Sequence, residues 1–150
     1  MTPSCPIRFF FFVEGSPRPQ PRPRATSFRA RDGQHRARVY NAPSADEWKA
    51  RVIAQARPYR PARPIRGPLT VHLTFCMPRP GRLQRRKDPD GPIPHAVKPD
   101  KDNLEKAIFD CLTDDGWWED DAQIYAGQTE KWYAAKGEKP GVWIEIVRED

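Results

Sequence analysis

Proline constrains the fold of this chain more than any other residue type does. The sequence has 18 prolines in 150 residues, and each one removes a backbone donor and fixes a backbone dihedral angle. Between residues 15 and 24 proline recurs at every second position (GSPRPQPRPR), which excludes a helix and a central strand there. The core must therefore come from the proline-poor segments, with long irregular segments between them.

Several proline-poor segments have the pattern of strands. Residues 7–13 form an unbroken β-rich run, which is typical of a buried strand. Residues 68–77 and 142–147 alternate apolar and polar side chains, which is the period of a half-buried strand. Shorter strands are predicted at 36–40 and within 121–133. The sheet is therefore expected to draw its strands from both ends of the chain.

Two segments have the pattern of amphipathic helices. The first spans 45–57, and a capping box is predicted at its start, with Ser44 as the cap and Glu47 reaching back. In the second, Asp102 is expected to cap the helix and Glu105 to complete an Asp-x-x-Glu box. Its apolar stripe consists of Leu104, Ala107, Ile108, Cys111 and Leu112.

Length and element order together predict the architecture. A chain of 150 residues is most simply one domain, and only 37% of its residues are hydrophobic, so its core should be small for its length. The predicted order is β-β-α-β-α-β-β. This order favours an α+β fold over residues 1–150, with a single mixed sheet, two main helices packed on it and long basic loops.

Charge is divided unevenly along the chain. The formal balance of Lys and Arg over Asp and Glu is +14 for residues 1–99 and −8 for residues 100–150, which gives the net charge of +6. A basic surface beside an acidic site is typical of a protein that holds a metal ion against a polyanion. The alternative is an arginine-rich solvated surface without a ligand.

Most of the cations that matter lie in two irregular segments. One is the proline-rich stretch near the N-terminus, and the other covers residues 78–94, where no hydrophobic period survives and a mobile loop is expected. We expect these segments, with one lysine just before the acidic motif, to bind backbone phosphates of DNA. The predicted DNA-binding residues are Arg18, Arg22, Arg24, Arg79, Arg82, Arg85, Arg86, Lys87 and Lys98.

Carboxylates gather at the start of the second predicted helix. Asp100 and Asp102 stand two residues apart, Lys106 follows one helical turn later, and Asp120-Asp121 comes after the helix. Each aspartate alone is explained by a cap or a turn. Taken together they favour a site for a hard divalent cation, because Mg²⁺ takes carboxylate oxygens and leaves other positions to water and phosphate.

These motifs resemble a known signature. The run KPDKDNLEKAIFDCL at 98–112, followed by GWWEDDAQI at 116–124, is similar to the RusA family of Holliday junction resolvases, which are small dimeric Mg²⁺-dependent endonucleases of bacteria and prophages. Weaker similarity extends to the segment at Gly15 and the helix around Trp48. The arginine-proline-rich N-terminal segment and the loop at 78–94 depart from the family pattern, which bears on substrate preference.

The resemblance implies roles for individual residues. The catalytic set is Asp100, Asp102, Lys106 and Asp121. The metal ligands are Asp100, Asp102 and Asp121, with Asp120 as a further candidate. The resemblance also implies Mg²⁺ as the cofactor, with Mn²⁺ able to substitute, and a homodimer that cuts four-way junctions or related branched DNA in recombination and repair.

Alternatives from other classes remain open at this point. A non-catalytic phage or prophage protein that binds branched DNA accounts for the basic segments but not for the intact acidic set. An enzyme that uses a carboxylate pair on sugars leaves the basic half unexplained. A requirement for divalent metal separates the endonuclease from both.

Two further expectations concern partners and location. The pair Trp117-Trp118 or residues 124–133 are candidates for a dimer contact, with core packing as the alternative. Three widely spaced cysteines without a CxxC pair, and no apolar run long enough to span a bilayer, predict a reduced protein of the bacterial cytoplasm, encoded by host or phage, without a membrane partner.

Overall fold

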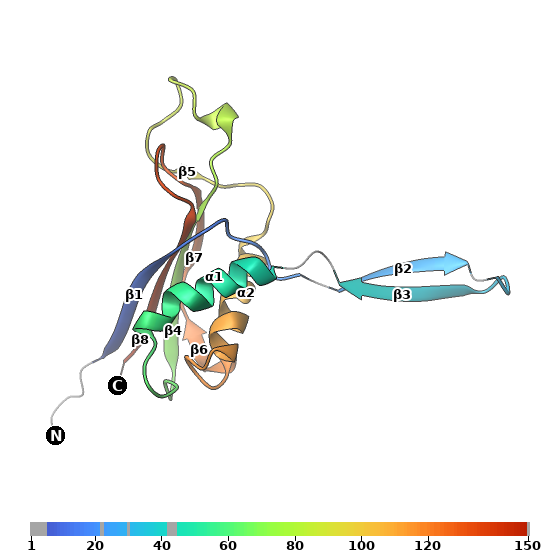
Figure 1. The fold of residues 1–150 in the computed structure, drawn as a ribbon, viewed down its shortest axis with the longest axis horizontal. Helices are drawn as coiled ribbons and strands as arrows, with labels where there is room; N and C mark the ends of the chain where they lie inside the picture. Colours follow the sequence, from blue (N-terminus) through green and yellow to red (C-terminus); the bar gives the residue numbers. More distant parts are fainter. Residues whose placement is uncertain (1–5, 22, 30, 42–44, 150) are drawn as a thin grey trace.

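A computed structural model describes residues 6–21, 23–29, 31–41 and 45–149, with only the backbone considered for 23–29 and 35–41. The chain forms eight strands and two main helices (Figure 1). The strands are β1 (Ile7–Glu14), β2 (Pro23–Arg29), β3 (His35–Asn41), β4 (Leu69–Met77), β5 (Ile93–Pro94), β6 (Ile124–Ala126), β7 (Thr129–Tyr133) and β8 (Gly141–Arg148). The helices are α1 (Asp46–Ala56) and α2 (Lys101–Asp114).

Six strands form one mixed sheet in the order β1-β8-β4-β7-β5, and β6 also pairs with β4. The β1–β8, β8–β4 and β7–β5 pairs are antiparallel, whereas β6 and β7 both run parallel to β4. Two helices pack on this sheet (Figure 1). The predicted α+β architecture with one mixed sheet is therefore confirmed.

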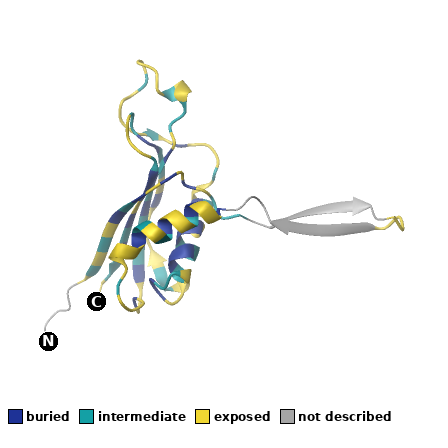
Figure 2. Cartoon of the chain, in the orientation of Figure 1, coloured by how far each residue is buried: buried dark blue, intermediate teal, exposed yellow. Residues whose placement is uncertain are grey.

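The core lies where the helices meet the sheet (Figure 2). Along β4, buried and half-buried residues alternate through all nine positions, because successive side chains of a strand point to opposite faces. The apolar stripe of α2 packs onto that buried face. Burial also raises the pKa of the Cys111 thiol to about 12, which fits its predicted place in the core.

Both predicted helix caps need correction. Ala45 occupies the N-cap of α1, and Ser44, the predicted cap, lies outside the described residues. Asp100, not Asp102, is the N-cap of α2, and no side chain caps that helix. The predicted Asp-x-x-Glu box at Asp102 is therefore wrong, because the helix begins one residue earlier, at Lys101.

One strand was not expected from the sequence. β2 begins inside the proline-rich stretch and pairs with β3 as a separate two-stranded ribbon, which stands away from the main sheet (Figure 1). Pro23 is tolerated because it is the first residue of β2 and the ribbon has only edges. The predicted strand at 121–133 is also divided, into a 3₁₀ turn, β6 and β7.

Trp117 and Trp118, the predicted dimer contacts, are core residues. Their exposed fractions are 0% and 1%, so neither side chain reaches a surface where a second subunit could bind it. Trp118 donates from Nε1 to Thr113 Oγ1 at the end of α2 (2.6 Å). Of the helices in the described part of the chain, none is long and apolar enough to cross a membrane.

Candidate metal and nucleic-acid site

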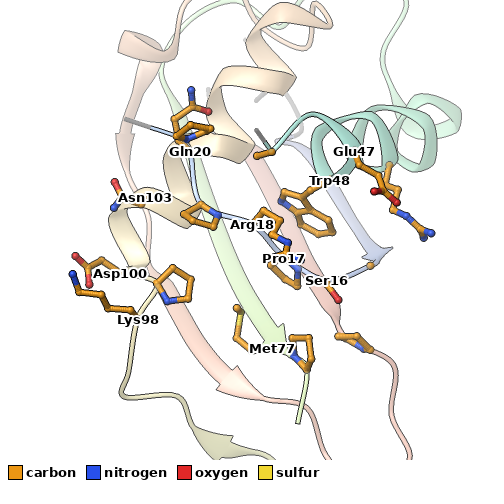
Figure 3. Close-up of a pocket in the computed structure, with 18 of the residues that line it drawn as sticks. Ser16, Pro17, Arg18, Gln20, Glu47, Trp48, Met77, Lys98, Asp100 and Asn103 are labelled. Carbon is orange, nitrogen blue, oxygen red and sulfur yellow. The ribbon is translucent and has the colours of Figure 1, made fainter. Parts of the chain in front are cut away.

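The start of α2 opens onto the largest cleft of the described structure. This cleft has a volume of about 1350 Å³, and its walls come from the segment after β1, the first turns of α1, the end of β4 and the entry to α2. Figure 3 shows Lys98, Asp100 and Asn103 on one side and Glu47 and Trp48 on the other. The cleft therefore joins one predicted metal ligand to predicted DNA-binding cations.

The proline-rich segment is laid across this cleft by specific contacts. Gly15 has a φ of +145°, and an added Cβ would lie 3.0 Å from the ring of Trp48, so glycine is required at this position. Gln20 donates its backbone N–H to the Asn103 carbonyl of α2 (2.9 Å). These two anchors hold Arg18 in the cleft wall near Asp100 (Figure 3).

Asp100 and Asp102 present exposed carboxylates at the N-terminus of α2. The Asp100 carboxylate accepts no capping hydrogen bond, whereas Asp102 accepts one from the backbone N–H of Asn103 (3.0 Å). The unpaired N–H groups of a helix start favour negative charge nearby. The helix therefore stabilises both carboxylates as anions and leaves oxygen atoms available to a cation.

Strand β7 holds the approach to these carboxylates from below. Lys131 donates from Nζ to the carbonyls of Val97 and Pro99, at 2.7 Å in both cases. Two residues earlier on the same face of the strand, Thr129 donates its hydroxyl to a carboxylate oxygen of Glu105 in α2. The strand thus fixes both the segment before Asp100 and the first turns of the helix.

Lys106 is exposed on α2, one turn after Asp102. Its Nζ donates to Asp110 Oδ1 (3.3 Å), four residues further along the helix. An exposed ion pair of this spacing contributes only about 0.3–0.5 kcal/mol, so Lys106 can leave it at little cost. The side chain is therefore available to a phosphate group near the N-terminal half of α2.

The Asp-Asp-x-Gln motif divides structural and exposed roles between neighbouring residues. Asp120 accepts a hydrogen bond from the N–H of Ala122 (2.8 Å) and caps the 3₁₀ turn at Asp121–Gln123. Gln123 accepts from the N–H groups of Glu119 and Asp120 and donates to the carbonyls of Ile65 and Gly67. Asp121 remains exposed at the start of the turn.

The three predicted metal ligands are not gathered into one cluster. Within the described ranges no group of three or more His, Cys, Asp or Glu side chains lies close enough to share an ion. Asp100 and Asp102 open α2, whereas Asp121 follows its far end, and a helix of 14 residues rises by about 20 Å. The chain then returns toward α2, because Ile124 and Gly127 line a small pocket with Glu105 and Phe109.

The donor set still suits Mg²⁺. Asp100 and Asp102 offer exposed carboxylate oxygens, and Asp100 is free of capping duty. Mg²⁺ retains several waters and needs only one or two carboxylates together with substrate phosphate. The ligand chemistry at the start of α2 therefore fits the ion, with Asp121 as a ligand only if it comes closer when DNA binds.

The basic loop, residues 78–92 between β4 and β5, is tied together by two of its own cations. Arg79 donates to the carbonyls of Leu83, Pro89 and Gly91, and Lys136 donates from Nζ to those of Arg85 and Asp88, at 2.8 Å in both cases. The expectation of a loop without structure is therefore wrong. Arg79 spends its guanidinium donors inside the loop, which leaves it few for phosphate.

The remaining predicted DNA-binding residues fall into three groups. Arg82, Arg85, Arg86 and Lys87 are exposed on the basic loop, and Arg85 also pairs with Asp88 (3.2 Å). Arg18 and Lys98 line the cleft. Arg22 lies outside the described residues, and Arg24 belongs to β2, where only the backbone is described. The cleft and the basic loop are thus separate basic surfaces.

Comparison with known proteins agrees with this arrangement. The family model described as "Endodeoxyribonuclease RusA" matches residues 14–147. The chain belongs to the RusA family. It is 33% identical over 91 residues to the crossover junction endodeoxyribonuclease rusA of Enterobacteria phage 82, a match that covers 59% of this chain and 70% of that protein. The crossover junction endodeoxyribonuclease RusA of Escherichia coli (strain K12) matches to the same extent.

Two residues of the RusA-type site were missed by sequence reasoning. Gln123 lies within the signature, but its four hydrogen bonds depend on a loop almost 60 residues away. Lys131 gave no local signal, because a lysine on a half-buried strand is normally a solvated side chain. Only the pairing of β7 with β4 brings it under the start of α2.

Proposed function

We propose that this chain is a Mg²⁺-dependent, structure-selective endodeoxyribonuclease, a hydrolase that resolves four-way junctions or related branched DNA by paired phosphodiester cleavage. Its role lies in DNA recombination and repair in the bacterial cytoplasm, where DNA is found and cysteines stay reduced. Mn²⁺ is expected to substitute for Mg²⁺, because it accepts the same oxygen ligands.

One observation carries the proposal. The cleft at the start of α2 combines an uncapped, exposed Asp100 with Arg18 and Lys98, in a chain that matches the RusA family over most of its length. Carboxylates bind a hard cation and guanidinium and ammonium groups bind phosphate. A phosphodiester held between them has both partners that hydrolysis requires.

The chain's own residues divide the work. Asp100 and Asp102 would hold the metal, with Asp121 and, less directly because of its capping role, Asp120 as further ligands. Bound there, Mg²⁺ supplies an activated water and charge stabilisation on the phosphate. Lys106 neutralises charge on the phosphate or orients the attacking water. Arg18, Lys98 and the exposed cations of the basic loop bind backbone phosphates, which positions DNA without reading its sequence.

A homodimer follows from the substrate. Two strands must be cut at positions related by a two-fold axis, and one chain provides one acidic site. Two-fold pairing is the commonest oligomer geometry. Light scattering should give a mass of about twice the 17.3 kDa of the chain. A mass near 17.3 kDa, both alone and on junction DNA, would leave a single-strand nicking enzyme.

The decisive experiment compares substrates and metals. Purified protein is incubated with a four-way junction and with linear duplex of the same sequence, without metal, with Mg²⁺ and with Mn²⁺. The proposal predicts symmetric paired incisions in the junction only when metal is present. Cleavage that persists in a chelator, or equal cleavage of linear duplex, contradicts it.

The separation of Asp121 from the start of α2 favours a second candidate. A protein that binds branched DNA without cutting it needs the basic surfaces but not a gathered set of three ligands. It predicts tight junction binding and no incision with either metal. The same incubations, combined with a gel-shift assay, distinguish the two functions.

A further inference from the structure

Strand β7 contacts the entry segment, residues 95–100, at successive points along its length. The backbone of β5 pairs with Tyr133 and Trp132, and His95 then donates its N–H to the carbonyl of Lys131 (3.1 Å). The chain leaves the strand at this point. Backbone pairing therefore ends four residues before Asp100.

The Lys131 side chain continues the attachment where the backbone stops. Its ammonium group donates to the carbonyls of Val97 and Pro99, each at 2.7 Å, which are the two carbonyls that flank Lys98. Both distances are typical of charge-assisted hydrogen bonds. The Pro99 carbonyl belongs to the peptide group of Asp100, so Lys131 holds the peptide plane from which Asp100 begins.

We propose that Lys131 is a positioning residue for the metal site, and that it sets the place of the Asp100 carboxylate by clamping the carbonyls of Val97 and Pro99. The inference deepens the proposed function and rests on it. Thr129 assists from the same face of β7, because it binds Glu105 in the first turns of α2. The metal ligand is thus oriented from a strand that provides no ligand itself.

The contacts exclude two simpler roles for Lys131. A lysine that binds phosphate presents its ammonium group to solvent, whereas at least two of the three donors here are bound to carbonyls of the same chain. A lysine that only stabilises a loop acts anywhere along that loop, whereas this one brackets the residue before the metal motif. Partners that orient a ligand typically account for a 10- to 100-fold effect on metal affinity or activity.

Lys136 provides a matched control. It also donates from Nζ to two backbone carbonyls at 2.8 Å, but these belong to the basic loop and not to the entry segment. Lys131→Met and Lys136→Met each remove one ammonium group and two charge-assisted hydrogen bonds. The two variants therefore differ in what is positioned and not in the chemistry that is lost.

The experiment measures metal binding, DNA binding and turnover separately. Mn²⁺ binding is followed by electron paramagnetic resonance without DNA, and KM and kcat are measured on a four-way junction. We expect K131M to weaken Mn²⁺ binding and lower kcat by about 10- to 100-fold with KM within about twofold. We expect K136M to raise KM and to leave Mn²⁺ affinity within about twofold of wild type. Lys131→Arg, which keeps charge and donors, should recover most of the metal affinity.

A measurement on the unaltered protein covers the case in which K131M does not fold. Nuclear magnetic resonance of the lysine NH₃⁺ groups should show slow proton exchange at Lys131 Nζ and couplings to the carbonyl carbons of Val97 and Pro99. Absence of these couplings overturns the inference. Equal Mn²⁺ affinity in K131M and wild type also overturns it, as does a K131R variant as impaired as K131M.

Failure of the inference differs from failure of the proposed function. If wild type binds Mn²⁺, K131M binds it more weakly and neither cuts the junction, the positioning role stands and the nuclease proposal falls. If wild type cuts the junction and K131M has unchanged metal affinity and kcat, the nuclease proposal stands and the positioning role falls. A wild type that binds no Mn²⁺ overturns both.

Discussion

The basic loop and the entry segment are built alike and present opposite charge. Each is an irregular stretch next to β5, and each is held by a lysine whose ammonium group donates to two backbone carbonyls, Lys136 in the first and Lys131 in the second. The basic loop then exposes arginines, whereas the entry segment leads to exposed aspartates.

The comparison shows that charge alone does not assign a role. In both segments some cations are bound to backbone carbonyls and others face solvent. Arg79 and Lys136 maintain the basic loop, while Arg82 and Arg86 are available to a ligand. Partners of the donors, and not the number of positive residues, therefore separate structural cations from binding ones.

The largest expected difference between the regions follows from removing a metal ligand. Asp100→Asn should reduce cleavage by more than the roughly 100-fold that loss of an outer-shell partner costs, while junction binding is retained or improved because repulsion of phosphate falls. Asparagine is a good N-cap residue, so α2 should persist. Asp114→Asn, at the other end of α2, is the control. Cleavage near the wild-type rate in D100N removes Asp100 from the site.

Loss of exposed cations should act on binding and not on chemistry. Arg82→Ala combined with Arg86→Ala should weaken junction binding and lower the slope of log affinity against log salt by about 0.9 for each lost phosphate contact. Arg63→Ala with Arg66→Ala removes the same charge elsewhere. An unchanged slope in the loop variant, or an equal change in both, shows that the basic loop is not a DNA contact.

Arg79 separates structural from binding cations within one loop. Arg79→Met removes the donors to three carbonyls and should lower the free energy of unfolding by about 1–3 kcal/mol, as measured by urea denaturation. Arg82→Met, at an exposed position, should change it by no more than about 0.5 kcal/mol. If the two variants are equally stable, the carbonyl clasp does not stabilise the protein.

The smallest effect is expected at the junction of the two regions. His95 is buried between them, and burial, assisted by the charge of Lys131, lowers its pKa below 6.5. The folded state therefore favours neutral His95, and the unfolded chain takes up a proton first as pH falls below about 6.5. Stability should drop more between pH 7.5 and 5.5 in wild type than in His95→Gln. Parallel curves contradict this.

The fold could be predicted from the sequence wherever one local period dominated. Alternation at 68–77 and the apolar stripe of α2 are signals that burial enforces, and both elements appear as expected. β2 escaped prediction because its stability comes from pairing with β3 and not from its own proline-rich sequence. The start of α2 was misplaced by one residue, because aspartates at 100 and 102 are equally good caps.

The candidate site was predictable only in part. Asp100, Lys98 and Arg18 share a cleft, since the signature and the proline-rich segment carry local information. Asp121 was expected beside Asp100, and the structure separates them, because proximity depends on how the chain returns after α2. Lys131 could not have been found, because its partners are carbonyls, which no sequence pattern marks.

The two-residue link between β6 and β7 sets a rule for insertions. Gly127 has a φ of +147°, and an added Cβ would meet the Val71 carbonyl, while Gln128 exchanges hydrogen bonds with His72 and Leu73 of β4. One extra residue here would turn Lys131 to the opposite face of the sheet, and two would restore the face but move it by about 6.6 Å. Relatives that keep the activity should therefore vary in length within the basic loop, and keep the spacing between Asp121 and Lys131 constant.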